Sequence, residues 1–187
     1  MNVPIEQCIE AVLEAIPYKM RSDPTFSLVP LISAIEGSGL TMVEVGSFTG
    51  ESTEAFALSG KFKQITAVDA WSNDVKSEAF VHCDMALAEQ LFILRTYKHK
   101  IIRRMRSPSI LASHQFPDHS IDFVYIDADH EYNNVSDDIS HWLPKVRQSG
   151  YIGGHDFSIY FPGVVMAVQE VFPNPILFPD SSWLVKL

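Results

Sequence analysis

Short apolar runs and helical stripes alternate along this chain, and the alternation predicts strands joined by helices. Residues 65–68 and 121–126 are mostly apolar runs bounded by polar or turn residues, as buried strands are. Between such runs, apolar residues return every three or four positions, which is the spacing of one helical face. The repeat of strand, helix and strand predicts an α/β fold with a mostly parallel sheet and helices on both faces.

The expected elements follow from this pattern in chain order. A surface helix from Ile5 to Ile16 and a short helix from Leu28 to Ile35 are separated by a break at 17–24. After them come expected strands and helices, in the order strand 41–45, helix 52–58, strand 65–68, helix 74–97, a strand from Ile101, strand 121–126, a helix around 135–143, strand 151–154, a helix from Pro162 and a last strand 182–187.

A glycine-containing loop follows the expected strand at 41–45. Gly46 lacks a Cβ where the chain must turn sharply beneath a ligand, and Gly50 lets the next helix begin close by. The first backbone N–H groups of that helix have no partner inside the helix. A dinucleotide fingerprint would need glycine where the chain has Phe48 and Glu51, and the Gly-Lys-Ser/Thr of a phosphate loop is missing. The loop therefore predicts a site for a small polar molecule, and both nucleotide-phosphate interpretations are weakened.

Two acids extend this site. Glu44 lies inside the strand before the loop, where a buried carboxylate is costly without a cationic or N–H partner, and a positively charged ligand would supply one. Asp69 follows the strand at 65–68, and the carboxyl end of a parallel strand is where such a fold binds ligands. The glycine pair alone also suits any strand-to-helix turn, but together with Asp69 it favours a ligand site.

A second group of polar side chains follows the strands at 121–126 and 151–154. Asp127, Asp129 and His130 come after the first, and His155 and Asp156 after the second. If these strands are parallel neighbours, their ends lie about 5 Å apart at one edge of the sheet. Hard divalent cations prefer carboxylate oxygens, and a histidine ligand widens the choice from Mg²⁺ toward Mn²⁺, Fe²⁺ or Zn²⁺. Aspartates also cap helices and turns, but three beside two histidines favour a site.

Composition and charge limit the classes of protein. The 187 residues suffice for one domain, 1–187, with 47% hydrophobic and 20% charged residues, as in a soluble globular protein. Cys8 and Cys83 have no metal-site or disulfide spacing, and no signal peptide or membrane-spanning run is found, so we expect a cytoplasmic protein without a membrane partner. The net charge of -9 opposes binding to nucleic acid, so no nucleic-acid partner is expected.

One basic cluster stands against this charge. It comprises Lys98, Lys100, Arg103, Arg104 and Arg106, around the start of the third expected strand. Charged residues keep an edge strand from pairing with other chains, and we prefer this interpretation over a phosphate-binding patch.

The spacing Glu44-x-Gly46-x-x-x-Gly50, with Asp69 ending the next strand, resembles the first two motifs of class I S-adenosylmethionine-dependent methyltransferases. The resemblance implies a Rossmann-like, seven-stranded fold with N-terminal helices at 1–40 and a catalytic core at 41–187. It also implies that the glycine loop binds the methionine part of S-adenosylmethionine and that Asp69 binds the ribose. Trp71 has an aromatic ring that could cover adenine or simply pack. The implied cofactor-binding residues are Glu44, Gly46, Ser47, Gly50, Ser52, Asp69, Ala70, Trp71, Ser107 and Asp127.

The stretch 126–157, with DADHEY, DI-x-x-W-x-P and GGHDF, resembles the metal-dependent small-molecule O-methyltransferases of this class, such as the macrocin-type sugar enzymes and catechol O-methyltransferase. This resemblance implies that Asp127, His155 and Asp156 bind a divalent metal, with Mg²⁺ or Mn²⁺ expected. It implies that His130 is the general base and that Asp127 also takes part in catalysis. Many relatives carry a carboxylate at the position of His155. The implied acceptor is a hydroxyl of a small molecule, a sugar diol or a catechol.

Two other functions stay open at this point. A cofactor-binding module without its own chemistry, such as the partner subunit of a methyltransferase, would suit a short chain, but it would not need the acids and histidines of 127–156. A nucleic-acid methyltransferase finds support only in the basic cluster, and the Asn/Asp-Pro-Pro-aromatic motif of amino-group methylation is missing. A homodimer is the oligomeric state kept as an alternative to a monomer.

Overall fold

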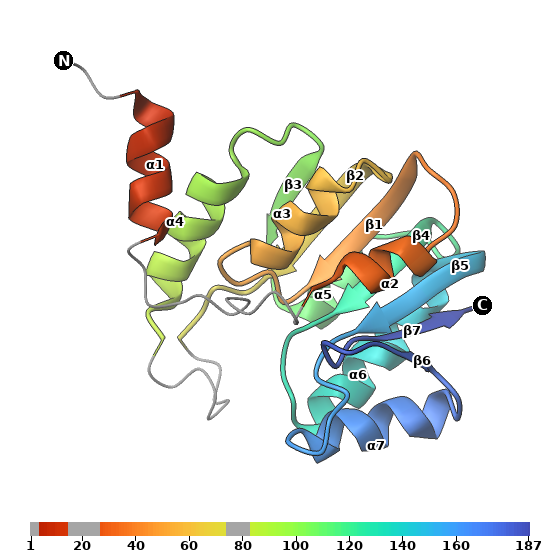
Figure 1. Ribbon diagram of the computed structural model, residues 1–187. Coiled ribbons are helices and arrows are strands. Elements are labelled where there is room, and N and C mark those ends of the chain that lie inside the picture. The colour runs from red at the N-terminus through yellow and green to blue at the C-terminus, as the bar shows by residue number, and fades with distance from the viewer. Residues whose placement is uncertain (1–3, 15–26, 74–82) are drawn as a thin grey trace.

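A computed structural model describes residues 4–14, 27–73 and 83–187. Its helices and strands alternate along the chain (Figure 1). In order they are α1 (Ile5–Glu14), α2 (Val29–Ala34), β1 (Leu40–Val45), α3 (Glu51–Leu58), β2 (Phe62–Asp69), α4 (Met85–Thr96), β3 (Ile102–Arg106), α5 (Ser109–Ser113), β4 (Ile121–Ile126), α6 (Tyr132–Trp142), the 3-10 turn η2 (Leu143–Lys145), β5 (Val146–Gly154), α7 (Pro162–Val171), β6 (Ile176–Leu177) and β7 (Trp183–Lys186).

The strands form one seven-stranded sheet in the order β3-β2-β1-β4-β5-β7-β6. The first five strands of this order run parallel, while β7 is antiparallel to both β5 and β6. The chain leaves β1 toward β2 on one side and later returns to β4 on the other, so the strand order reverses beside β1. Open α/β sheets bind ligands at the carboxyl ends of the strands at such a reversal.

Helices cover both faces of the sheet (Figure 1). Successive residues of β1 point to opposite faces: Met42 packs with α2 and α3, while Val43 and Val45 pack with α6 and α7. The same division holds in β4, where Phe123 and Val124 belong to different clusters. These central strands are therefore buried on both faces, which explains their nearly continuous apolar sequence. The expected mostly parallel, Rossmann-like sheet with helices on both faces is confirmed.

Three elements differ from the expectation. The helix α5 and the strand β6 were not expected, because neither five nor two residues give a readable period. The strand β5 begins at Val146, five residues before the expected start, because its first half contains exposed polar residues. The expected break at 17–24, Ile16 and the first part of the helix expected at 74–97 lie outside the described residues. Within the described ranges, no helix has both the length and the apolar character needed to cross a bilayer.

Candidate functional site

Gly46 ends β1 at a point where the backbone approaches two other strands. Its N–H donates to the carbonyl of Val68 at 2.8 Å, and its φ is +87°. A Cβ at this position would lie 2.1 Å from the backbone oxygen of Asp127. Gly46 is therefore required both by backbone conformation and by the close approach of β4.

Gly50 closes the same loop and caps α3. Its φ is +82°, its N–H donates to the carbonyl of Ser47 at 2.7 Å, and its carbonyl accepts the N–H of Glu54 at 2.9 Å. A Cβ there would lie 2.9 Å from Cδ2 of Phe92. The two predicted glycines thus act differently: Gly46 lies at the ligand side of the loop, and Gly50 lets α3 pack against α4.

Asp69 holds the loop after β1 and the loop after β2 together. Its Oδ2 accepts the N–H of Phe48 at 2.9 Å, and its Oδ1 accepts the N–H of Trp71 at 2.7 Å. Burial raises the pKa of Asp69, while those two N–H donors act in the opposite direction. Each carboxylate oxygen can accept more than one hydrogen bond, so Asp69 keeps capacity for further donors.

The expected basic cluster supports the loop after Asp69. Arg104 and Arg106 both form ion pairs with Glu89 of α4, which is 9% exposed. Arg106 also donates to the carbonyl of Trp71 at 3.3 Å and to that of Ala70 at 3.4 Å. Because β3 is the edge of the sheet, the preferred interpretation of this cluster as a charged edge strand agrees with the structure.

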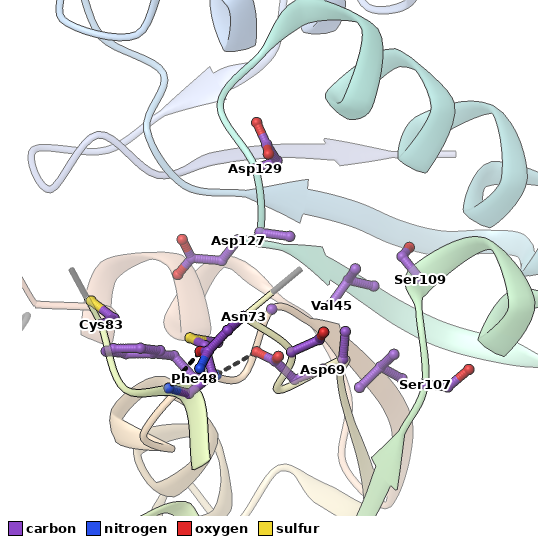
Figure 2. Close-up of a pocket in the computed structure, with 15 residues that line it drawn as sticks. Val45, Phe48, Asp69, Asn73, Cys83, Ser107, Ser109, Asp127 and Asp129 are labelled. Atoms are coloured by element: carbon purple, nitrogen blue, oxygen red, sulfur yellow. Dashed lines mark hydrogen bonds between the residues drawn. The ribbon is translucent and has the colours of Figure 1, made fainter. Parts of the chain in front are cut away.

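A cavity of about 530 Å³ opens at the carboxyl ends of β1, β2, β3 and β4. In Figure 2, Asp127 and Asp129 lie above Asp69, Ser107 lies to its right, and Ser109 lies above Ser107. Predicted residues that line this cavity are Gly46, Asp69, Ala70, Ser107 and Asp127. The lining residues that sequence reasoning missed include Phe48, Ser72, Asn73, Cys83, Met85 and Ser109.

Glu44 and Trp71 were predicted at this cavity but do not line it. The carboxylate of Glu44 is fully buried and accepts the hydroxyl of Thr53, so α3 supplies the partner that we expected from a cationic ligand. Burial raises the pKa of Glu44 to about 7, and the hydroxyls of Ser52, Thr53 and Ser47 act in the opposite direction. Glu44 therefore lies beneath the glycine loop and supports it from below.

Trp71 packs instead of covering the cavity. It is 1% exposed, its ring centroid lies 5.1 Å from that of Phe92, and its Nε1 donates to the carbonyl of Phe48 at 2.8 Å. Of the two interpretations given to Trp71, the packing one describes its position in the structure.

A second cavity of about 200 Å³ adjoins the first across Gly46, Phe48, Asp127 and Ala128. One wall comes from the glycine loop and the start of α3, with predicted Ser47 and Ser52. The other wall carries the acids and histidines of the β4 and β5 ends, together with the aromatic ring of Phe161. Phe161 was not predicted at the site. The sequence places it directly before Pro162, where a helix was expected to begin, but nothing in the pattern indicated that its ring faces the site.

The acids and histidines of this second cavity converge. The Nδ1 atom of His155 lies 3.0 Å from Oδ1 of Asp156 and 4.0 Å from Oδ1 of Asp127. The other oxygen of Asp156, Oδ2, lies 2.9 Å from Nε2 of His130. Because β4 and β5 are parallel neighbours, as predicted, residues 26 to 29 positions apart in the chain meet here. Asp129 caps a turn, which was the alternative role considered for these aspartates. Its Oδ1 accepts the N–H of Glu131 at 2.8 Å in the turn before α6.

The ionisable side chains of this cavity shift each other's pKa values. Burial raises the pKa of Asp156, but the hydrogen bonds of His130 and His155 outweigh it and hold that pKa well below its usual range. Burial lowers the pKa of His130, yet its hydrogen bond to Asp156 and the charges of Asp156, Asp127 and Asp129 raise it overall. The site is thus an anionic group of carboxylates that attracts positive charge.

Three of these side chains, from Asp127, His155 and Asp156, are placed so that they could bind a divalent cation. One ligand atom each from Asp127, His155 and Asp156 can be chosen so that all lie within 4.8 Å of one another. An ion bound at about 2.1–2.3 Å separates its ligand atoms by roughly 3 to 4.5 Å. Carboxylate oxygens with one imidazole suit Mg²⁺ or Mn²⁺, and also Fe²⁺ or Zn²⁺.

Comparison with known proteins extends these observations. Residues 43–157, more than half of the chain, match the family described as methyltransferase domain. Uncharacterized protein R132 of Acanthamoeba polyphaga mimivirus is 26% identical over 143 residues, which cover 75% of this chain and 63% of that protein. The chain therefore spans a little under two thirds of the length of this relative.

Solved structures show the same fold at low sequence identity. A SAM-dependent methyltransferase from Aquifex aeolicus matches with a TM-score of 0.60 and 11% identity, covering 97% of this chain and 96% of that chain. A SAM-dependent O-methyltransferase from Thermotoga maritima matches with a TM-score of 0.57 and 11% identity, covering 87% of this chain and 55% of that chain. Their likeness extends over most of the described architecture, the seven-stranded sheet included.

Proposed function

The chain belongs to the methyltransferase domain family, and we propose that it is an S-adenosylmethionine-dependent, divalent-metal-dependent O-methyltransferase acting on a hydroxyl of a small molecule. Family membership supports the enzyme class and the methyl donor. One observation carries the rest of the proposal: Asp127, His155, Asp156 and His130 converge in a cavity that adjoins the larger one. A domain that only bound the cofactor would have no use for this group.

The two cavities suggest how donor and acceptor meet. The larger one, lined by Gly46 and Asp69, has a volume suited to S-adenosylmethionine, and the smaller one would hold the acceptor. In the reaction, the acceptor oxygen attacks the methyl carbon as the bond from carbon to sulfur breaks and its electron pair returns to sulfur. Residues shared by both cavities, Gly46 and Asp127 among them, would align the three reacting atoms and keep water away.

His130 is suited to take the proton of the acceptor hydroxyl. An ionised carboxylate can only accept, so Asp156 fixes the hydrogen of the imidazole on Nε2 and leaves Nδ1 as the basic nitrogen. Asp127, His155 and Asp156 would hold the metal ion, which when bound lowers the pKa of a coordinated alcohol. Because two adjacent hydroxyls chelate a cation better than one, the proposed acceptor is a diol, either of a sugar or of a catechol.

The first test separates cofactor, metal and acceptor. Titration calorimetry with S-adenosylhomocysteine, with Mn²⁺ or Mg²⁺ and again with EDTA, should give micromolar affinity under all conditions. Methyl transfer from S-adenosylmethionine to catechols and glycosides should then require the metal. Transfer that is equally fast in EDTA would contradict metal dependence, and failure to bind S-adenosylhomocysteine would remove the methyl donor itself.

A further inference from the structure

Two consecutive apolar side chains are the most exposed large hydrophobic residues described in this chain. Ile159 is 88% exposed and Tyr160 is 82% exposed, in the connection between β5 and α7. Single exposed hydrophobic residues are common on protein surfaces, whereas contiguous exposed apolar surface marks sites of interaction. We call these two residues the apolar rim.

The backbone hydrogen bonds of the connection hold the apolar rim in place. The N–H of Ser158 donates to the carbonyl of Asp156 at 2.8 Å, and the N–H of Phe161 donates to the carbonyl of Ser158 at 3.1 Å. The N–H of Tyr160 itself donates to Oγ of Ser158 at 3.3 Å. Ile159 and Tyr160 are therefore presented outward by a hydrogen-bonded turn, and this order has an entropic cost that calls for a reason.

In the chain, the apolar rim lies between two residues of the smaller cavity. Asp156 and Phe161, on either side of this turn, both line that cavity. The ring of Phe161 lies 4.3 Å from that of His130, centroid to centroid. At the start of α7, a Cβ on Gly163 would lie 2.4 Å from the carbonyl oxygen of His130. The connection from β5 to α7 therefore touches the connection from β4 to α6, and Figure 1 shows both at the same end of the sheet.

Size and polarity indicate what the apolar rim contacts. A cavity of about 200 Å³ holds little more than one small ring, since typical ligand sites measure roughly 300–1,000 Å³. The opposite wall is polar, with Ser47, Thr49 and Glu51. Two side chains expose roughly 300–400 Å², well below the roughly 800 Å² that each partner of a protein complex buries. The rim is thus sized for part of a small molecule.

We infer that the acceptor is amphipathic: its hydroxyl end occupies the smaller cavity, and an apolar or aromatic extension lies outside against Ile159 and Tyr160. This inference rests on the proposed function and names the substrate class within it. Ile159 and Tyr160 are specificity-determining residues for the extension, and they take no part in the chemistry at His130.

The experiment compares acceptors that differ only in their apolar extension. Initial rates are measured with 4-alkylcatechols and with alkyl glucosides, each from methyl to hexyl, with S-adenosylmethionine and Mn²⁺. For the wild type, kcat/KM should rise about tenfold or more along the accepted series. In Ile159→Ser/Tyr160→Ser, the rise should shrink to threefold or less, while the methyl member keeps its kcat/KM within twofold.

A matched control and the contrary outcomes complete the test. Leu58→Ser removes another exposed hydrophobic residue, 69% exposed, at the end of α3 that points away from the cavities, and should leave the dependence on chain length intact. Equal rises in the wild type and the double variant, or no rise in the wild type, would overturn the inference. Failure of the proposed function looks different: S-adenosylhomocysteine binds, but no member of either series is methylated, which removes the acceptor and the inference with it.

Discussion

Nε2 of His130, from the loop after β4, lies 2.9 Å from Oδ2 of Asp156, from the loop after β5. The second oxygen of Asp156 faces Nδ1 of His155 at 3.0 Å, so one carboxylate connects two imidazoles. Asp156 has a φ of +62°, a backbone conformation that aspartate tolerates better than most residues do. This single side chain thus joins the proposed base to the proposed metal ligands, and changes to it should affect both.

Replacement of Asp156 by alanine should abolish methyl transfer while leaving the affinity for S-adenosylhomocysteine within a few-fold. The reason is that Asp156 lines the smaller cavity and is not among the residues of the larger one. Calorimetry measures the affinity, and a methyl-transfer assay measures the rate. Asp118→Ala, at an exposed acid paired with Lys145, is the control. Equal losses of affinity and rate would remove Asp156 from the metal site.

His130→Gln should lower kcat about 100-fold or more, because a positioned general base contributes roughly 10²–10⁴ in rate. Part of the loss should return at high pH, where the acceptor ionises without help. In the wild type, kcat should rise with pH because only the neutral imidazole takes a proton, and in the metal-free protein Asp156 raises the pKa of His130 above its usual range. His114→Gln, at an exposed histidine, is the control, and an unchanged rate in His130→Gln would exclude this role.

The sequence predicted those strands and helices that have a regular spacing of apolar residues, and the polar residues that directly follow the strands. Gly46, Asp69, Asp127 and Asp156 could be assigned to one edge of the sheet because each follows a readable buried strand. The sequence did not predict whether a side chain on a loop packs into the protein core or faces the cavity. Trp71 was the clearest case, since its burial against Phe92 depends on packing between elements distant in sequence.

Glu44→Gln should stabilise the protein at alkaline pH. The pKa of Glu44 is raised by burial to about 7 from 4.5, so the folded state binds this proton more tightly than the unfolded state does. The contribution of Glu44 to stability is therefore greatest below about pH 4.5 and is lost as the pH rises to about 7. The full shift corresponds to about 3 kcal/mol at pH 8. Urea unfolding at pH 5 and pH 8 measures the difference.

Glutamine has the shape of glutamate but no charge, so Glu44→Gln should gain over the wild type at pH 8 and differ little at pH 5. Glu36→Gln, at a glutamate on the surface, should not reproduce this trend. Parallel pH dependences of the wild type and Glu44→Gln would show that Glu44 does not carry its proton as inferred.

Glu89→Gln should weaken the binding of S-adenosylhomocysteine about three- to tenfold and leave kcat at saturating cofactor unchanged. Glu89 holds Arg106, whose guanidinium donates to the carbonyls of Ala70 and Trp71 in the loop after Asp69. Loosening that loop raises the cost of ordering it around the cofactor. Arg103→Ala replaces an exposed arginine of β3, the strand that contains Arg106, and should leave the affinity measured by calorimetry unchanged. A drop in kcat with unchanged affinity would assign Glu89 another role.

Gly46→Ala and Gly60→Ala separate backbone strain from close approach. Both glycines have a positive φ, +87° and +69°, so alanine costs roughly 1 kcal/mol at either position. At Gly60 a Cβ meets nothing within 4 Å, whereas at Gly46 it would lie 2.1 Å from the carbonyl oxygen of Asp127. That oxygen belongs to the backbone, so the end of β4 must move away from β1. We therefore expect Gly46→Ala to lose several kcal/mol more than Gly60→Ala in urea unfolding.

The same displacement should be visible in function. Asp127 lines both cavities, so moving it away from Gly46 widens the junction where donor and acceptor would meet. In those Gly46→Ala molecules that stay folded, kcat should fall more than the affinity for S-adenosylhomocysteine, because alignment over less than 1 Å governs the transfer step. Gly60→Ala should keep both values. If Gly46→Ala matched Gly60→Ala in stability and in kcat, the contact between the ends of β1 and β4 would not be what positions Asp127.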